Sequence, residues 1–195
     1  MMPQQAVEEI IAAGRRLAAR GLITAHSGNI SCRLAGREIL ITAAGLYKGG
    51  LTGQDLLRVD QDGQTVEAAA GRRPSSETAL HLALYQEYPH IAAIVHAHPP
   101  YATALGCSGR APDWQMLEEG ALFLGPVALL PRLPAGSKEL VQAAVAAAPG
   151  RNALLLADHG AFSWGESIEQ ALCRMEILEH IAQVTLLCSL CSHFR

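Results

Sequence analysis

The chain has 195 residues, of which 50% are hydrophobic and 17% are charged, a balance typical of a globular domain and not of a disordered chain. A formal net charge of -3 provides no basic surface for nucleic acid or for an anionic membrane, so neither is expected as a partner. No apolar run reaches the ~18 residues that a transmembrane helix requires, and the polar start lacks a secretory signal, so we expect a cytoplasmic protein.

Helices and short strands are interleaved along the predicted chain. Apolar residues recur at helical spacing in some segments and alternate with polar residues in others, and glycine-rich turns separate the segments. The helices are expected at residues 4–20, 76–87, 101–106, 137–147 and 167–190. The strands are expected at residues 30–34, 38–42, 56–60, 65–67, 91–97, 127–130, 153–157 and 161–164.

These elements predict an α/β fold with three layers, α/β/α, around a mixed sheet in a single domain over residues 1–195. Several neighbouring strands are spaced as hairpins, which is incompatible with a regular doubly wound parallel sheet. Ser75 or Ser76 is expected to cap the helix that follows. The segment 107–126 has no clear periodicity, and its large apolar residues are expected in the core: Trp114, Leu117, Leu122 and Phe123.

Two histidines end a predicted strand in the stretch Ile94-Val95-His96-Ala97-His98-Pro99-Pro100. Alternate residues of a strand point to the same face, so His96 and His98 project together where the prolines stop the strand. Paired imidazoles of this kind form two corners of a metal site. The alternative is that one histidine is a hydrogen-bonded core residue and the other is a loop residue.

A third histidine, His159, follows the apolar strand at 153–157. Three imidazoles at strand ends can bind a divalent ion, for which zinc is the best match, and leave a position open for a substrate. Glu77 is the natural fourth group, because the positive end of the helix dipole favours a carboxylate there. Taken alone, Glu77 would be an ordinary acid in the first turn of a solvated helix.

Two loops of small residues have the chemistry of an anion site. Ser75 and Ser76 offer hydroxyl and N–H groups at a helix N-terminus, and Gly28 and Asn29 bring amides from a second loop. Each loop alone has a plainer explanation, as a helix cap and as a turn. A phosphate held by both loops beside a metal ion would suit an enzyme that acts on a sugar phosphate.

Less is expected of the other histidines and of the cysteines. His81, one turn after Glu77, is expected to pair with Glu77 on the helix surface, and contact with the site is the alternative. His26, which precedes the Gly28-Asn29 loop, could contact the substrate. Three further histidines are expected at the surface: His90, His180 and His193. The five cysteines are odd in number and scattered, which favours a reducing compartment, and the Cys188–Cys191 pair is expected in a packed helix end.

Four segments resemble the class II aldolase/adducin family, most closely its L-fuculose-1-phosphate aldolase-like members: GLITAHSGNISCR, ITAAGLYKGGLTGQDLLRVD, RRPSSETALHLALYQEYPHIAAIVHAHPPYATAL and ALLLADHGAFSWGESIEQAL. The resemblance runs from about residue 5 to residue 187. It implies a three-layer α/β/α fold with a mostly antiparallel sheet, and a homotetramer. It also implies a zinc-dependent lyase that cleaves a ketose 1-phosphate into dihydroxyacetone phosphate and an aldehyde, with Mn²⁺ or Co²⁺ as substitutes for zinc.

The resemblance also assigns roles to single residues. It places the zinc ligands on His96, His98 and His159, and it makes Glu77 both a possible ligand and the catalytic acid–base group. It places the phosphate on the loops that contain Gly28, Asn29, Gly45, Ser75 and Ser76. Other family members carry out decarboxylation, epimerisation or dehydration on the same site, and adducin-like domains have no catalysis, so these functions remain alternatives.

Three positions depart from the family pattern. Ala44 stands where a Thr or Ser usually precedes the glycine of the second phosphate loop, so one hydroxyl contact is lost. Trp114 occupies the region of the aldolase's tyrosine proton donor, and an indole N–H is not a practical acid. Gln115 replaces the glutamate expected of a dehydratase, which argues against that branch.

Overall fold

The structure, a computed structural model that describes residues 3–192, is built on one eight-stranded sheet. The strands lie in the order β4-β3-β2-β1-β5-β8-β7-β6, and every neighbouring pair is antiparallel except β6 and β7. Their bounds are β1 Asn29–Arg33, β2 Ile39–Thr42, β3 Leu56–Val59, β4 Thr65–Glu67, β5 Ala93–Ala97, β6 Val127–Leu130, β7 Ala153–Leu156 and β8 Gly160–Gly165. The prediction of a mixed, mostly antiparallel sheet is confirmed.

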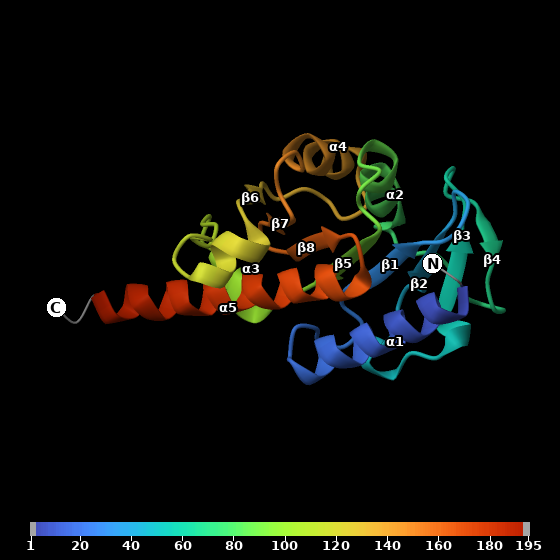
Figure 1. Cartoon of the computed structure of the whole chain (residues 1–195), viewed down its shortest axis with the longest axis horizontal. Coiled ribbons are helices and arrows are strands. Elements are labelled where there is room, and N and C mark those ends of the chain that lie inside the picture. The colour runs from blue at the N-terminus through green and yellow to red at the C-terminus, as the bar shows by residue number, and fades with distance from the viewer. Residues whose placement is uncertain (1–2, 193–195) are drawn as a thin grey trace.

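In the described part of the chain, five α-helices cover the two faces of the sheet and complete the three layers (Figure 1). Their bounds are α1 Pro3–Ala19, α2 Thr78–Glu87, α3 Pro100–Cys107, α4 Lys138–Ala147 and α5 Ile168–Ser192. Each face of the sheet has a hydrophobic core cluster. The first cluster packs α1, α3 and α5 against the strands, and the second packs α2 and α4 against the opposite face. Alternate residues of β5 divide between the faces: Val95 faces the first cluster and Ile94 the second. Within the described chain, no helix is long and apolar enough to cross a membrane.

Strand pairing gathers the predicted site residues at one end of the central strands β1, β5 and β8. In the register of β1 with β5, Asn29 lies opposite His96, and in that of β5 with β8, Ala97 lies opposite Ala161. The end of β5 therefore meets the beginnings of β1 and β8. His96 lies in β5, His98 follows β5 by one residue, and His159 precedes β8 by one residue.

Two apolar assignments from the sequence are wrong. Leu122 and Phe123 are 66% and 56% exposed, because the single π-helical turn Gly120–Leu124 buries its two end residues and turns its middle outward. Trp114 and Leu117 do pack against the core, as expected. The end of α5 is not packed either, since Cys188, Cys191 and their neighbour Leu190 are exposed.

Candidate active site

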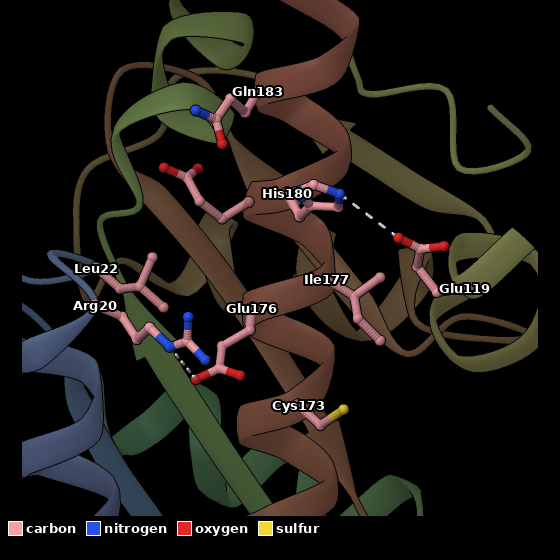
Figure 2. Close-up of a pocket in the computed structure, with 9 residues that line it drawn as sticks. Arg20, Leu22, Glu119, Cys173, Glu176, Ile177, His180 and Gln183 are labelled. Carbon is pink, nitrogen blue, oxygen red and sulfur yellow. Dashed lines mark ion pairs between the residues drawn. The ribbon is translucent and has the colours of Figure 1, made fainter. Parts of the chain in front are cut away.

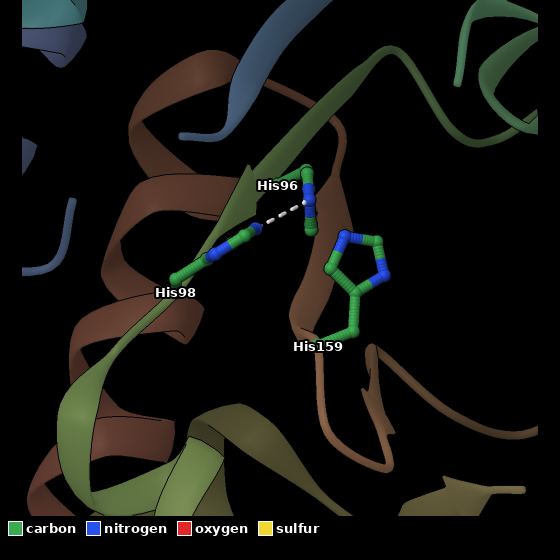
Figure 3. Close-up of side chains that lie close together, drawn as sticks. All are labelled: His96, His98 and His159. Carbon is green, nitrogen blue, oxygen red and sulfur yellow. Dashed lines mark hydrogen bonds between the residues drawn. The ribbon is translucent and has the colours of Figure 1, made fainter. Parts of the chain in front are cut away.

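Three imidazoles converge at this end of the central strands (Figure 3). The rings of His96, His98 and His159 have centroids 4.9–5.0 Å apart, and one nitrogen from each lies within 4.8 Å of the others. The Nε2 atoms of His96 and His98 are 3.2 Å apart. Two nitrogens bound tetrahedrally to zinc at ~2.0–2.1 Å would be about 3.3 Å apart, so this spacing fits a shared ion.

The surroundings of His96 fix which of its nitrogens faces the cluster. Its Nδ1 lies 2.9 Å from the carbonyl oxygen of Ala161, and this contact places the proton on Nδ1 and leaves Nε2 free to bind a metal. The ring stacks on Phe162 with centroids 4.2 Å apart. Burial, followed by repulsion from His98 and His159, holds the pKa of His96 well below its usual value. The neutral form that ligates metals is therefore favoured.

His159 lies in a turn, and His98 directly follows β5, where its N–H donates to the carbonyl oxygen of Leu22 at 3.0 Å. Burial lowers the pKa of His98 as well, with repulsion from His159 as the next cause. Asp158, in the turn before His159, has a φ of 59°, a left-handed conformation that Asp tolerates better than most residues. Gly160 allows close approach at this turn, since a Cβ there would lie 2.7 Å from Cδ2 of His98.

Glu77 is the buried carboxylate of the site, and it is only 5% exposed. Its Oε2 accepts a hydrogen bond from Nδ2 of Asn29 at 2.8 Å and lies 3.1 Å from Nε2 of His96. Its Oε1 lies 3.5 Å from Nε2 of His159 and has no hydrogen-bond partner among the described residues. A buried carboxylate oxygen without a donor is costly, so the atom is well suited to a metal ion or a substrate proton.

Helix α2 begins later than predicted, and this changes how the serines act. Glu77 itself is the N-cap, without a side-chain cap bond, so the prediction that Ser75 or Ser76 caps this helix is wrong. Ser75 Oγ instead accepts the N–H of Glu77 at 3.3 Å and a bond from Asn29 Nδ2 at 3.2 Å. Ser75 thus helps to orient the carboxylate as well as lining the cavity.

A cavity of ≈ 250 Å³ opens beside the three histidines. All five residues expected to bind phosphate line it: Gly28, Asn29, Gly45, Ser75 and Ser76. Gly28 has a φ of +76°, and a Cβ there would lie 2.5 Å from the carbonyl oxygen of His96, so only glycine brings this loop so close to the site. The structure therefore brings together the metal-ligating and phosphate-binding candidates in one cavity.

Sequence reasoning missed Lys48, which also lines this cavity. Its side chain is only 1% exposed, and burial lowers the pKa of its ammonium to about 8. Lys48 lies in the segment 43–50, which is one of the glycine-rich turns predicted between the strands. The spacing of Lys48 from Gly45 was the available signal, but charged residues in such turns are usually solvated.

His81 is not on the helix surface, contrary to the prediction. It is completely buried in α2, and its Nδ1 lies 2.7 Å from Oγ of Ser31, which also contacts the hydroxyl of Tyr85 at 2.8 Å. Six residues of α2 are buried: Thr78, Leu80, His81, Leu82, Leu84 and Tyr85. Of the histidines expected at the surface, His90 and His180 are exposed, and His193 lies outside the described residues.

Burial of His81 predicts acid sensitivity. Burial lowers its pKa to about 3, whereas an unfolded histidine titrates near ~6.5. Between these values the unfolded chain binds more protons, so the free energy of unfolding should fall as the pH falls from about 6.5, by up to ~1.4 kcal/mol per pH unit for this group. In chelator-treated protein, urea titrations from pH 7 to 4.5 should show a shallower decline for His81→Gln than for the wild type. His90→Gln is the exposed control, and equal slopes for all three proteins would contradict the assignment.

A larger cavity of ≈ 380 Å³ lies between the end of α1 and α5 (Figure 2). Its charged groups already have partners: Glu176 binds Arg16 at 2.7 Å, Glu179 accepts the N–H groups of Tyr101 and Ala102, and His180 lies 3.6 Å from Glu119. Glu179 is thus a cap for α3. Because these groups stabilise helix contacts, this cavity has the character of a structural cleft.

Comparisons with known proteins find relatives over nearly the whole chain. Residues 8–186 match the family described as the Class II Aldolase and Adducin N-terminal domain. A methylthioribulose-1-phosphate dehydratase of Methylococcus capsulatus is 33% identical over 193 residues, covering 89% of both chains. A 3-oxo-tetronate 4-phosphate decarboxylase of Escherichia coli K12 is 34% identical over 169 residues, covering 85% of this chain and 78% of the relative. The crystal structure of an L-fuculose-1-phosphate aldolase from Thermus thermophilus, 32% identical, matches with a TM-score of 0.84 over 97% of both chains.

Proposed function

This chain belongs to the class II aldolase and adducin family as an enzyme, and we propose that it is a metal-dependent lyase that breaks a C–C bond of a phosphorylated keto sugar or keto sugar acid. The observation that carries the proposal is the cavity itself. It combines three converging imidazoles, one buried carboxylate and two loops of small residues suited to phosphate. The ion is proposed to be zinc, which imidazole-rich sites favour.

The proposed substrates share one product fragment. Aldol cleavage of a ketose 1-phosphate breaks the bond between C3 and C4, and releases dihydroxyacetone phosphate with an aldehyde. Loss of CO₂ from 3-oxo-tetronate 4-phosphate, the substrate named for one relative, also leaves dihydroxyacetone phosphate. In both reactions the electron pair of the broken bond remains on the carbon next to the ketone, and that carbon must then receive a proton.

The residues of the cavity divide this work between them. The loops of Gly28 and Ser75 would hold the phosphate and so fix which carbon lies beside Glu77. In aldol cleavage, Glu77 as a carboxylate would take the proton that the C4 hydroxyl loses when the aldehyde forms, and would then deliver it to that carbon. In decarboxylation, Glu77 would deliver a proton that it takes up from solvent. A divalent ion bound by the three histidines would polarise the substrate ketone as a Lewis acid. Asn29 would keep Glu77 oriented through its 2.8 Å hydrogen bond.

Dehydration is the second candidate, because methylthioribulose-1-phosphate dehydratases recur among the relatives. Removal of water needs one group to take a proton from carbon and an acid to protonate the leaving hydroxyl. Among the described residues that line the cavity, Glu77 is the only carboxylate. Gln115, at the position expected for a second acid, is exposed and does not titrate. Decarboxylation needs only a proton donor to carbon, and in aldol cleavage Glu77 can take the hydroxyl proton and then return it to carbon, so C–C cleavage is favoured.

The test is a panel of three substrates with protein loaded with Zn²⁺, Mn²⁺ or Co²⁺: L-fuculose 1-phosphate, 3-oxo-tetronate 4-phosphate and methylthioribulose 1-phosphate. We expect metal-dependent release of dihydroxyacetone phosphate from one of the first two, measured by coupled oxidation of NADH, and loss of that activity on chelation. Detection of the aldehyde or of CO₂ then distinguishes aldol cleavage from decarboxylation. Turnover of methylthioribulose 1-phosphate alone would overturn the proposal in favour of dehydration.

The homotetramer implied by the family stays a prediction. Two apolar side chains near the end of α5 support self-association, since Leu187 is 48% exposed and Leu190 is 59% exposed. Leu122 and Phe123 form a second exposed apolar pair, beside the beginning of the same helix.

A further inference from the structure

Lys48 is a buried cation without a carboxylate partner. Its Nζ donates hydrogen bonds to the carbonyl oxygens of His26 at 3.0 Å and Leu46 at 2.7 Å, and no ion pair of Lys48 occurs within residues 3–192. Carbonyl oxygens solvate an ammonium only in part, and a buried charge is costly unless an opposite charge compensates it. Glu77 is the carboxylate whose charge acts on Lys48, but the two form no ion pair, so a bound anionic ligand can serve as the direct counter-ion.

The two hydrogen bonds place this cation between the candidate phosphate loops. His26 lies in the loop that leads to Gly28 and Asn29, and Leu46 follows Gly45 in the second loop. Lys48 thus links the two loops through its hydrogen bonds, and it lines the same cavity that both loops line. An ammonium has three N–H donors, so one remains after these two bonds.

The charges of the cavity point to an anion at Lys48. Among the described residues that line it, Lys48 is the only lysine or arginine, and Glu77 is the only carboxylate. The serine hydroxyls and loop amides offer dipoles but no positive charge. Without Lys48 the protein groups of the cavity would have a net negative charge, which disfavours a phosphate dianion.

We propose that Lys48 binds the phosphate group of the substrate, through its third N–H and its charge, while its other two donors hold the phosphate loops in place. This inference rests on the proposed function for the presence of a phosphorylated substrate. It adds an electrostatic anchor that compensates for Ala44, where the second loop lacks a hydroxyl. Lys48 is thereby a substrate-specificity residue, which favours phosphorylated over unphosphorylated sugars.

The test uses inorganic phosphate as the probe and metal-loaded protein. Lys48→Met removes the charge and the donors, and Lys48→Gln removes the charge but keeps an amide that can donate to the loops. We expect both variants to bind phosphate about 10- to 100-fold more weakly by calorimetry, the usual size of a charge-assisted hydrogen bond. Lys138→Met is the matched control, because Lys138 is the chain's other lysine and is exposed. The phosphate affinity of this variant should equal that of the wild type.

If the Lys48 variants fail to fold, a measurement on the wild-type protein still tests the proposal. With ¹⁵N-labelled lysine the chain contributes only two side-chain signals, and Lys138→Met assigns them. Added phosphate should shift the Lys48 Nζ signal, with the same dissociation constant that calorimetry gives. The Lys138 signal should not shift. An unshifted Lys48 signal, or wild-type affinity in folded Lys48→Gln, would reduce Lys48 to a structural tie between the loops.

These outcomes separate this inference from the proposed function, because phosphate binding is read without turnover. Phosphate affinity that depends on Lys48, together with no lyase activity on any of the three sugar phosphates, would overturn the function alone. Lyase activity with an unchanged KM in Lys48→Gln would overturn the inference alone.

Discussion

Replacing His98 with alanine should remove the bound metal and the activity while leaving the fold intact. His98 is the suitable histidine because it is half-buried, whereas His96 is 1% exposed and stacked on Phe162, so its truncation would also open a cavity in the core. Loss of a residue that merely orients a metal ligand costs ~10- to 100-fold in metal affinity. We expect more than about 100-fold for His98→Ala, because a ligand itself is lost.

The measurement is metal content after dialysis against a metal buffer, together with kcat and with circular dichroism to verify the fold. His26→Ala is the control, since His26 lines the same cavity but is exposed and lies outside the cluster of three imidazoles. Full metal content in folded His98→Ala would contradict the three-histidine site. Equal losses in His98→Ala and His26→Ala would show that the defect is not one of metal ligation.

Replacing Glu77 with glutamine should lower turnover by ~10²-fold or more and preserve the fold, since a positioned general acid–base group contributes about this much. The two side chains have nearly the same volume, and the glutamine carbonyl can still accept the 2.8 Å hydrogen bond from Asn29. What the amide cannot do is exchange a proton with the substrate carbon. We therefore expect most of the loss in kcat and little in KM, measured with whichever substrate of the panel is turned over.

A competing role for Glu77 makes a different prediction. Its Oε1 has no hydrogen-bond partner within residues 3–192 and lies 3.5 Å from Nε2 of His159, as a fourth metal ligand would. If ligation is its only role, Glu77→Gln should bind metal more weakly and recover full turnover in excess zinc. Such recovery would reject the acid–base role and leave the metal site standing. Asn29→Ala tests orientation, and should reduce turnover less than Glu77→Gln does.

The sequence by itself determined the main elements, the fold class and the candidate residues of the site. Period-2 and period-3.6 patterns are local, so β5, β7 and the helices could be placed within a few residues. The histidines of H-x-H share a face for the same local reason. The family-specific combination of Ser75-Ser76-Glu77 with His96, His98 and His159 then indicated one site.

Only the tertiary structure decided how the groups meet and what surrounds them. Asn29 reaches Glu77 across 48 positions of sequence because β1 pairs with β5 in a register that no local pattern specifies. Burial of His81 and Lys48 depends on distant elements: His81 meets Ser31 of β1, and Lys48 meets the carbonyl oxygen of His26. Exposure of Leu122 depends on a π-helical turn that sequence periodicity does not reveal. Composition fixes how much apolar surface must be buried, but the packing of distant segments decides which polar groups are buried with it.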